Sequence, residues 1–153
     1  MNMNREQLFT SNKQDWETPQ WLFDELNDEF NFELDAMATE QNAKCDIFFT
    51  KEDDALKKDW SQYNSIFINP PYQSSVQNAV LKKAYETNKN YGNTIVLLIP
   101  ARTDTARWHE HIFGKAEIRF LKGRLKFEVD GIEYKDAATF PSAIVIYRKG
   151  GHK

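Results

Sequence analysis

An unbroken apolar run, Ile95–Ile99, constrains the fold of this chain more than any other feature. A strand with one face in water alternates apolar and polar residues, whereas a strand covered on both faces is apolar throughout. Ser65–Ile68 is a second run of this kind, and a proline stands close behind each run, at Pro100 and Pro70. Segments with helical spacing lie between the strands. The pattern therefore predicts an α/β sheet with helices on both faces.

Start and stop signals place the other expected elements. Thr18 and Pro19 suit the N-cap and the first position of a helix that continues to Phe30. Asp130-Gly131 suits the turn of a β-hairpin. Further helices are expected from Ser74 or Ser75 and from about Asp104 to Phe113, and further strands over residues 32–35, 47–49, 116–121, 124–129 and 143–147.

Composition bounds the size and class of the protein. The 153 residues, 41% of them hydrophobic and 28% charged, suit one globular domain with its own core. We expect a flexible segment over residues 1–14 and a single domain over residues 15–150, without a membrane span. Cys45 is the single cysteine and no Cys/His cluster has zinc spacing, so we expect no disulfide, no metal site and a cytoplasmic location.

The candidate catalytic motif is Asn69-Pro70-Pro71-Tyr72, which directly follows the strand Ser65–Ile68. Ligands of open α/β sheets bind at the carboxyl ends of the strands, so this tetrapeptide stands where a site is expected. Its residues suit chemistry on an amino group whose lone pair is delocalised into a ring. The Asn69 side-chain carbonyl and the Pro70 backbone carbonyl can accept the two amino hydrogens. The Tyr72 ring can stack on the flat base that carries the amino group. Without the preceding strand, the tetrapeptide is equally well explained as a tight turn.

Several segments in matching order give the chain a family resemblance. They are Asp15–Pro19, Leu34–Ala38, Asn42–Cys45, Glu52–Asp54, Asn69–Tyr72 and Pro100–Thr105. Through these segments the chain resembles the small phage-type DNA adenine methyltransferases, the phage Dam family. The resemblance implies a compact Rossmann-like methyltransferase fold with S-adenosylmethionine as donor. It also implies methylation of the exocyclic amino group of adenine in DNA, in a bacterial host cell, by a protein that a phage or prophage encodes.

The resemblance also implies residues for the donor site. Trp16, Thr18 and Pro19 match the segment that packs on the donor near its methionine part. Asp54 matches the acid that contacts the adenine ring of the donor. Asp35 matches an acidic position beside either the methionine or the ribose part. Each has a structural alternative: a helix cap for Thr18-Pro19 and for Asp35, and an exposed acidic run for Asp54.

The segment after Asp35 departs from the pattern of the larger methyltransferases. Ala36–Thr39 contains no glycine, although a cofactor loop at this position normally carries several. Only 34 positions separate Asp35 from Asn69, so we expect an element of the usual set to be shortened or absent.

DNA contacts are expected from a small basic surface. A base inside a duplex is out of reach, so an enzyme that modifies it has to flip it out or act on single strands. Arg102, Lys122, Arg124 and Lys126 are the candidate phosphate or base contacts. The net charge of −3 argues against an extensive nucleic-acid interface, and a basic run is also typical of a solvated face.

Two alternatives remain for the function. The tetrapeptide is also similar to that of enzymes that methylate protein glutamine or amino groups in RNA, because a planar amide nitrogen poses the same lone-pair problem. The missing glycines leave open a DNA-binding relative without catalysis. No pattern in the sequence indicates the recognition sequence or the oligomeric state.

Overall fold

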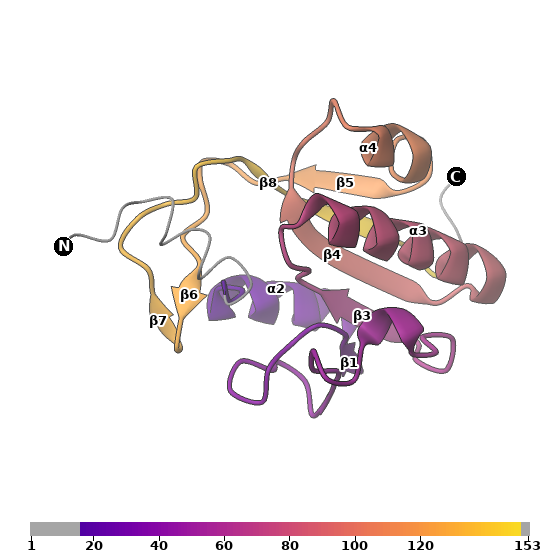
Figure 1. The fold of residues 1–153 in the computed structure, drawn as a ribbon, viewed down its shortest axis with the longest axis horizontal. Helices are drawn as coiled ribbons and strands as arrows, with labels where there is room; N and C mark the ends of the chain where they lie inside the picture. Colours follow the sequence, from indigo (N-terminus) through magenta and orange to yellow (C-terminus); the bar gives the residue numbers. More distant parts are fainter. Residues whose placement is uncertain (1–15, 151–153) are drawn as a thin grey trace.

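The computed structural model describes residues 16–150 (Figure 1), so the expected flexible segment 1–14 lies outside the described residues. The helices are α2 (Gln20–Phe30), α3 (Ser74–Tyr91) and α4 (Ala106–His111), with a 3-10 turn η2 (Ala55–Lys57). The strands are β1 (Leu34–Asp35), β2 (Ile47–Phe48), β3 (Ser65–Ile68), β4 (Thr94–Pro100), β5 (Glu117–Phe120), β6 (Glu128–Val129), β7 (Ile132–Glu133) and β8 (Ser142–Tyr147).

One sheet organises the molecule. Six strands follow the order β2-β1-β3-β4-β8-β5, and β6 and β7 form a separate hairpin (Figure 1). β2, β1, β3 and β4 are parallel, with Leu34 opposite Ile66 and Ile66 opposite Ile95. β8 is antiparallel to both of its neighbours, β4 and β5. This mostly parallel sheet with helices on both faces confirms the α/β prediction and is compatible with a Rossmann-like methyltransferase fold.

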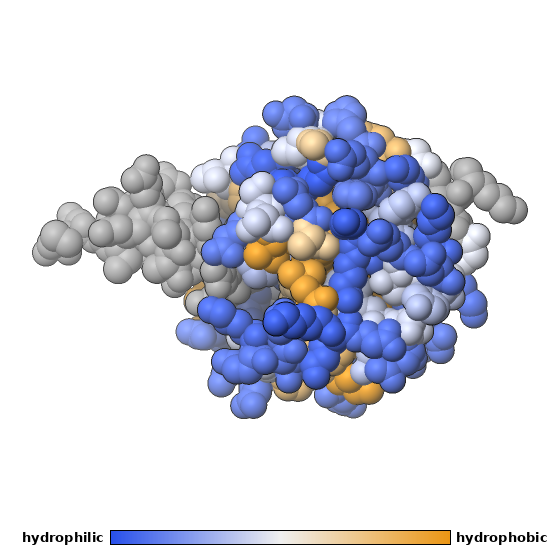
Figure 2. Space-filling view, turned by 45° about the vertical axis from the view of Figure 1, so that its right-hand side comes forward, coloured by the Kyte–Doolittle hydropathy of each residue, from blue (hydrophilic) through white to orange (hydrophobic). Residues whose placement is uncertain are grey.

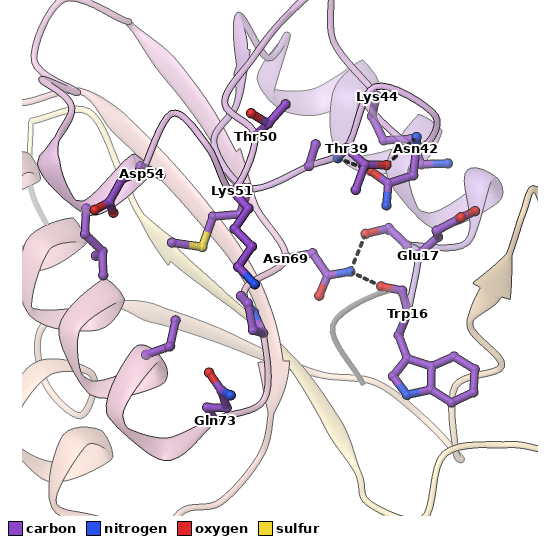
Figure 3. A pocket seen from close by; sticks show the side chains of 17 residues that line it. Trp16, Glu17, Thr39, Asn42, Lys44, Thr50, Lys51, Asp54, Asn69 and Gln73 are labelled. Atoms are coloured by element: carbon purple, nitrogen blue, oxygen red, sulfur yellow. Dashed lines mark hydrogen bonds between the residues drawn. The ribbon is translucent and has the colours of Figure 1, made fainter. Parts of the chain in front are cut away.

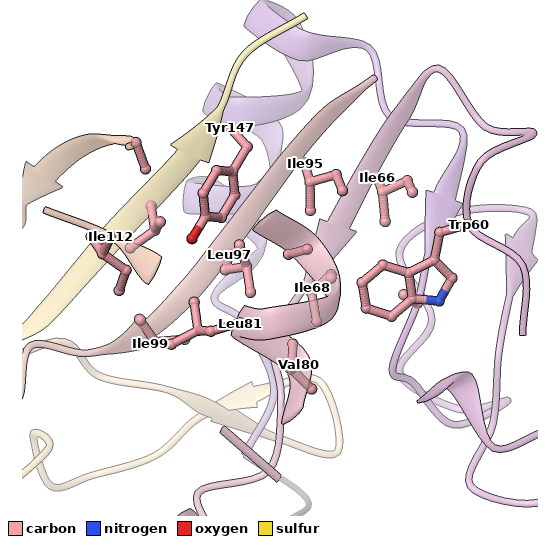
Figure 4. Close-up of a cluster of buried hydrophobic side chains, with 14 of the residues drawn as sticks. Trp60, Ile66, Ile68, Val80, Leu81, Ile95, Leu97, Ile99, Ile112 and Tyr147 are labelled. Carbon is pink, nitrogen blue, oxygen red and sulfur yellow. The ribbon is translucent and has the colours of Figure 1, made fainter. Parts of the chain in front are cut away.

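Alternate residues of the central strands face two different apolar layers. One layer, towards α3 and α4, contains Ile66, Ile95 and Leu97 together with Trp60, Leu81 and Trp108; most of it is drawn in Figure 4. The other layer, towards α2 and residues 121–140, contains Phe67, Val96 and Leu98 together with Leu22, Phe23 and Phe127. Burial on both faces explains why these strands are apolar without alternation.

The connection from β1 to β3 is short of helical structure. Residues 36–64 contain only β2 and the single turn η2, in place of the α-helix that usually links parallel strands. The shortening expected between Asp35 and Asn69 is therefore present. The two loops of this connection that directly follow β1 and β2 lie at the carboxyl edge of the sheet.

The helix starts differ from the cap pattern. α2 begins at Gln20, and Pro19 rather than Thr18 occupies the N-cap position without a side-chain cap. Gln73 occupies the N-cap position of α3, so neither Ser74 nor Ser75 is a cap. These hydroxyls have other partners: Thr18 accepts a hydrogen bond from Asn69, and Ser74 accepts one from Arg107.

Several expected elements are shorter than predicted, the helix near residue 106 and the strand near residue 124 most of all. α4 covers Ala106–His111, and the strand expected over 124–129 pairs only at Glu128–Val129. Leu125 and Phe127 are nevertheless buried, so residues 124–127 keep the alternation of a strand while they cover the α2 side of the sheet. Within residues 16–150, no helix combines the length and apolar character needed to cross a membrane.

Candidate active site

The tetrapeptide lies at the carboxyl edge of the sheet. Asn69 follows β3 directly, beside the end of the parallel strand β1. At the other end of the loop, the side-chain amide of Gln77 donates to the Pro71 carbonyl at 2.8 Å. No hydrogen bond within residues 16–150 reaches the Pro70 carbonyl. The loop is therefore held from α3, while the Pro70 carbonyl keeps its capacity to accept hydrogen bonds.

The side-chain amide of Asn69 is anchored by the segment that precedes α2. Its Nδ2 donates to the Trp16 backbone carbonyl at 3.0 Å and to the Thr18 hydroxyl at 3.1 Å. A primary amide has two hydrogens, and both are used here. Asn69 lines a cavity, and Figure 3 shows it between Trp16 on one side and Lys51 and Gln73 on the other. Its Oδ1 forms no hydrogen bond within residues 16–150, so this carbonyl can accept one from a ligand.

The cavity beside Asn69 has a volume of about 350 Å³, within the range of small-molecule sites. The loops after β1 and β2, the segment before α2 and the start of α3 surround it (Figure 3). Its apolar lining includes Met37, Ala38, Leu56, Pro71 and Val76. Its polar lining includes Glu17, Thr39, Asn42, Lys44, Lys51 and Asp54. A ligand with one flat apolar part and several charged or polar parts suits such a mixture. Figure 2 shows, on one face of the molecule, a strip of hydrophobic residues framed by hydrophilic ones.

Three of the five predicted donor-site residues line the cavity. Trp16, Thr18 and Asp54 border it together with Asn69, from three distant parts of the sequence. Pro19 is buried at the start of α2 and does not line the cavity.

Asp35 also does not line the cavity, because it faces the protein interior behind the loop that follows β1. Its side chain is only 3% exposed, and its Oδ2 accepts the backbone N–H of Lys44 at 3.0 Å. Burial raises the pKa of the Asp35 carboxyl to about 7, although the Lys44 N–H favours the charged form. Asp35 therefore holds the loop that carries Met37, Thr39 and Lys44 to the cavity wall.

Tyr72 packs in an aromatic cluster next to the cavity. Its ring centroid lies 5.2 Å from that of Phe140 and 6.2 Å from that of Phe127, both edge-on, and Trp16 lies 6.3 Å from Phe127. The Tyr72 hydroxyl is buried without a hydrogen-bond partner among the described residues, and burial raises its pKa well above the ordinary value. The hollow inside this aromatic cluster measures about 10 Å³, room for about one water molecule. The hollow between Tyr72 and its aromatic neighbours therefore has no room for a base in this arrangement.

The four predicted DNA contacts are exposed. Arg102 stacks over Phe140, with its guanidinium carbon 5.7 Å from the ring centroid. Arg124 and Lys126 point outward from the segment whose alternate residues are buried, and Lys122 lies just before it. The structure thus brings Arg102 to the rim of the aromatic cluster and leaves the other three cations on the surface of a segment that covers it.

Arg119, which lies three positions before Lys122, has a different environment from the four predicted DNA contacts. Its guanidinium pairs with Glu29 and with Glu117, each at 2.7 Å, and Arg148 pairs with the same two carboxylates. These charge-assisted bonds, led by the one to Glu29, raise the pKa of Arg119. This four-residue network joins the end of α2 to β5 and to the residue after β8, so Arg119 is engaged within the protein.

Sequence reasoning missed Glu17, Lys44 and Lys51 in the cavity wall. Glu17 is 9% exposed, and its carboxylate accepts the backbone N–H groups of Asp130 and Gly131 at the tip of the β6–β7 hairpin. Glu17 and Lys44 lie in segments that carry the family resemblance, but a single charged residue in a loop has no spacing pattern that assigns it a role. Within residues 16–150, no group of three or more His, Cys, Asp or Glu side chains is placed to hold a metal ion.

Comparisons with known proteins identify the family of this chain. The family model described as DNA N-6-adenine-methyltransferase (Dam) matches residues 5–151. The DNA N-6-adenine-methyltransferase of Escherichia phage T1 is 34% identical over 120 residues, which are 78% of this chain and 49% of that protein. The DNA N-6-adenine-methyltransferase of Haemophilus phage HP1 is 31% identical over 110 residues, which are 71% of this chain and 61% of that protein.

A bacterial protein is also similar over part of the chain. The putative methyltransferase YfdM of Escherichia coli K12 is 41% identical over 63 residues, 37% of this chain and 69% of that protein. The chain spans about half to three fifths of the length of the two phage relatives. The family model nevertheless covers almost all of it, and the chain belongs to the DNA N-6-adenine-methyltransferase (Dam) family.

Proposed function

We propose that this protein transfers a methyl group from S-adenosylmethionine to the exocyclic amino group of adenine in DNA. The observation that carries the proposal is Asn69 in the cavity wall, whose Oδ1 forms no hydrogen bond within residues 16–150, followed by the Pro70 backbone carbonyl, which no hydrogen bond in that part of the chain reaches. Asn69 is oriented by two hydrogen bonds from its Nδ2, and the loop is tied to α3 through Gln77. Two fixed acceptors beside a cofactor-sized cavity are what transfer to an amino group requires.

The chemistry follows from the electronic structure of the substrate. The lone pair of an aromatic amino group is delocalised, so the nitrogen is a poor nucleophile. Acceptance of its two hydrogens by Asn69 and Pro70 favours a pyramidal nitrogen and localises the lone pair. S-adenosylmethionine, when bound, supplies an electrophilic sulfonium methyl group. The protein contributes mainly orientation and preorganised dipoles. The methylated nitrogen is an acidic cation that can release its extra proton to water, so no strongly basic side chain is needed.

The cavity residues fit the proposed donor. Met37, Leu56 and Val76 offer apolar contact for its adenine ring, and Asp54 offers acceptors to its amino or hydroxyl groups. Lys44 and Lys51 can pair with the carboxylate of its methionine part. Trp16 and Thr18 would border the donor next to Asn69. Pro19 and Asp35 would act indirectly, through the start of α2 and through the loop after β1.

The DNA would approach over the aromatic cluster. Opening of the cluster around Tyr72 would let a flipped base reach Asn69 and stack on a ring, with Phe140 and Phe127 as its other neighbours. Arg102, Lys122, Arg124 and Lys126 would hold the phosphates. The names of both phage relatives specify DNA and adenine, and this favours DNA over RNA or protein glutamine. The reaction would then take place on DNA inside a bacterial host cell.

A methyl-transfer assay tests the proposal. The protein is incubated with isotopically labelled S-adenosylmethionine and unmethylated DNA of several sequences, and the DNA is digested to nucleosides. N6-methyladenine is the expected product, with RNA and a protein extract as competing acceptors. Asn69→Ala should abolish turnover while calorimetry shows unchanged binding of S-adenosylhomocysteine. A folded wild-type protein that binds S-adenosylhomocysteine but produces no methyladenine contradicts the proposal. Methylated RNA or glutamine in place of methyladenine would show that the substrate is not DNA.

A further inference from the structure

We infer that Thr18 is a positioning residue that fixes the orientation of the Asn69 amide for methyl transfer. The inference rests on the proposed function and assigns Thr18 a role towards Asn69, in addition to its place in the cavity wall. The Thr18 hydroxyl lies 3.1 Å from Asn69 Nδ2, and the Thr18 side chain belongs to a residue that is only 3% exposed.

The direction of these hydrogen bonds follows from chemistry alone. An amide oxygen and an amide nitrogen look alike in outline, so the orientation of an asparagine has to be deduced from its partners. The Trp16 carbonyl, 3.0 Å from Asn69, can only accept, so the group that faces it is the amide NH₂. The second hydrogen of that NH₂ then points to Thr18, whose hydroxyl accepts it. Oδ1 is thereby turned away from both partners.

Each partner has a distinct effect. With the Trp16 carbonyl alone, the amide could rotate about its side-chain bonds while keeping one hydrogen bond. The Thr18 hydroxyl supplies the second point of attachment and so defines the plane of the amide. Thr18 does not cap α2, because Pro19 occupies the N-cap position, and the Thr18 hydroxyl accepts from Asn69 instead.

The segment that carries Thr18 is itself held in place. The backbone of Glu17 exchanges two hydrogen bonds with Glu128 of the hairpin, at 2.9 and 3.0 Å, and the Glu17 carboxylate accepts the amides of Asp130 and Gly131. Thr18 is thus attached to a braced backbone, which is what a positioning residue needs in order to fix its neighbour.

Paired variants test the inference. Thr18→Val keeps the shape of the side chain but removes the acceptor, Thr18→Ser keeps the hydroxyl, and Thr94→Val makes the same change at the opposite edge of the sheet. Two quantities are measured: the single-turnover rate of methyl transfer, and the ¹⁵N NMR signals of the Asn69 side-chain NH₂, assigned by their loss in Asn69→Asp. Backbone NMR spectra verify that each variant is folded.

We expect Thr18→Val to lower the single-turnover rate by about tenfold to a hundredfold, the usual effect of one lost hydrogen bond to a buried polar group. The Asn69 NH₂ signals should move, and the Kd for S-adenosylhomocysteine should stay within about threefold. Thr18→Ser should stay within about threefold in rate, and Thr94→Val should leave the Asn69 signals unchanged.

Other results overturn the inference. Unmoved Asn69 NH₂ signals in Thr18→Val, or a loss confined to donor affinity, would show that Thr18 does not orient the amide. If the wild-type protein transfers no methyl group, the proposed function fails, and the NMR signals still decide whether Thr18 orients Asn69.

Discussion

The carboxylate of Glu17 accepts a hydrogen bond at 2.9 Å from the backbone N–H of Gly131, 114 positions later in the chain. Its second oxygen accepts the N–H of Asp130 at 3.0 Å. Glu17→Ala leaves both amides without this partner and should destabilise the protein by about 1–3 kcal/mol. Urea unfolding measures the change, and faster hydrogen exchange at Gly131 localises it. Glu133→Ala, on the exposed strand β7, is the control and should cost under about 0.5 kcal/mol. Equal losses in the two variants would contradict the bracing role of Glu17.

Tyr72 offers a test of ring against hydroxyl. Because its hydroxyl is buried without a partner among the described residues, Tyr72→Phe should preserve stability or raise it by up to about 1 kcal/mol. Methyl transfer should persist, since the proposed stacking on the base needs only the ring. Tyr72→Ala removes the ring that packs against Phe127 and Phe140 and should lower both stability and the methyl-transfer rate. A loss of more than about tenfold in the rate for Tyr72→Phe would mean that the hydroxyl takes part.

Asp35 predicts a pH dependence of stability. Its folded pKa is about 7, whereas an unfolded aspartate titrates near pH 4. The folded protein therefore binds a proton that the unfolded chain has lost between these values, and stability falls as pH rises through this window. At pH values above 7 this loss of stability amounts to about 4 kcal/mol, since each pKa unit corresponds to about 1.4 kcal/mol.

Asp35→Asn removes this dependence. The variant should be more stable than the wild type at pH 8, and the difference should vanish towards pH 4. Urea unfolding at pH 4.5, 6 and 8 measures it. Asp46→Asn, at an exposed position just before β2, controls for the loss of one negative charge. If the Asp35→Asn and wild-type curves run parallel across this range, burial of Asp35 does not govern the pH response.

The exposed cations predict a salt dependence of DNA binding. Each phosphate contact contributes about 0.9 to the slope of log affinity against log salt concentration. Combined replacement of Lys122, Arg124 and Lys126 by alanine should weaken binding on all sequences and reduce the slope by up to about three such contacts. Lys89→Ala, at the far end of α3, should change neither quantity. An unaltered slope in the triple variant would place the DNA elsewhere on the protein.

The centre of the fold is predictable because it depends on local patterns. The apolar runs at β3 and β4, with the prolines after them, are enough to predict that Asn69 lies at the carboxyl edge of the sheet. The partners of Asn69 are not predictable, since Trp16 and Thr18 lie 53 and 51 positions away and Thr18 carries an equally good helix-cap signal. Asp35 shows the same limit: its position at a strand end follows from the pattern, but the direction of its carboxylate depends on a loop amide at Lys44.

The anchored amide has a consequence for base selection. Both hydrogens of the Asn69 NH₂ are engaged, so this side chain presents only lone pairs to an incoming base. A base with a keto oxygen at the reactive position, such as hypoxanthine, would set oxygen against oxygen at both Asn69 and Pro70, with no proton between them. Buried groups left unpaired in this way discriminate strongly between close analogues. The two hydrogen bonds that would orient Asn69 towards adenine would therefore also exclude hypoxanthine, the deaminated counterpart of adenine.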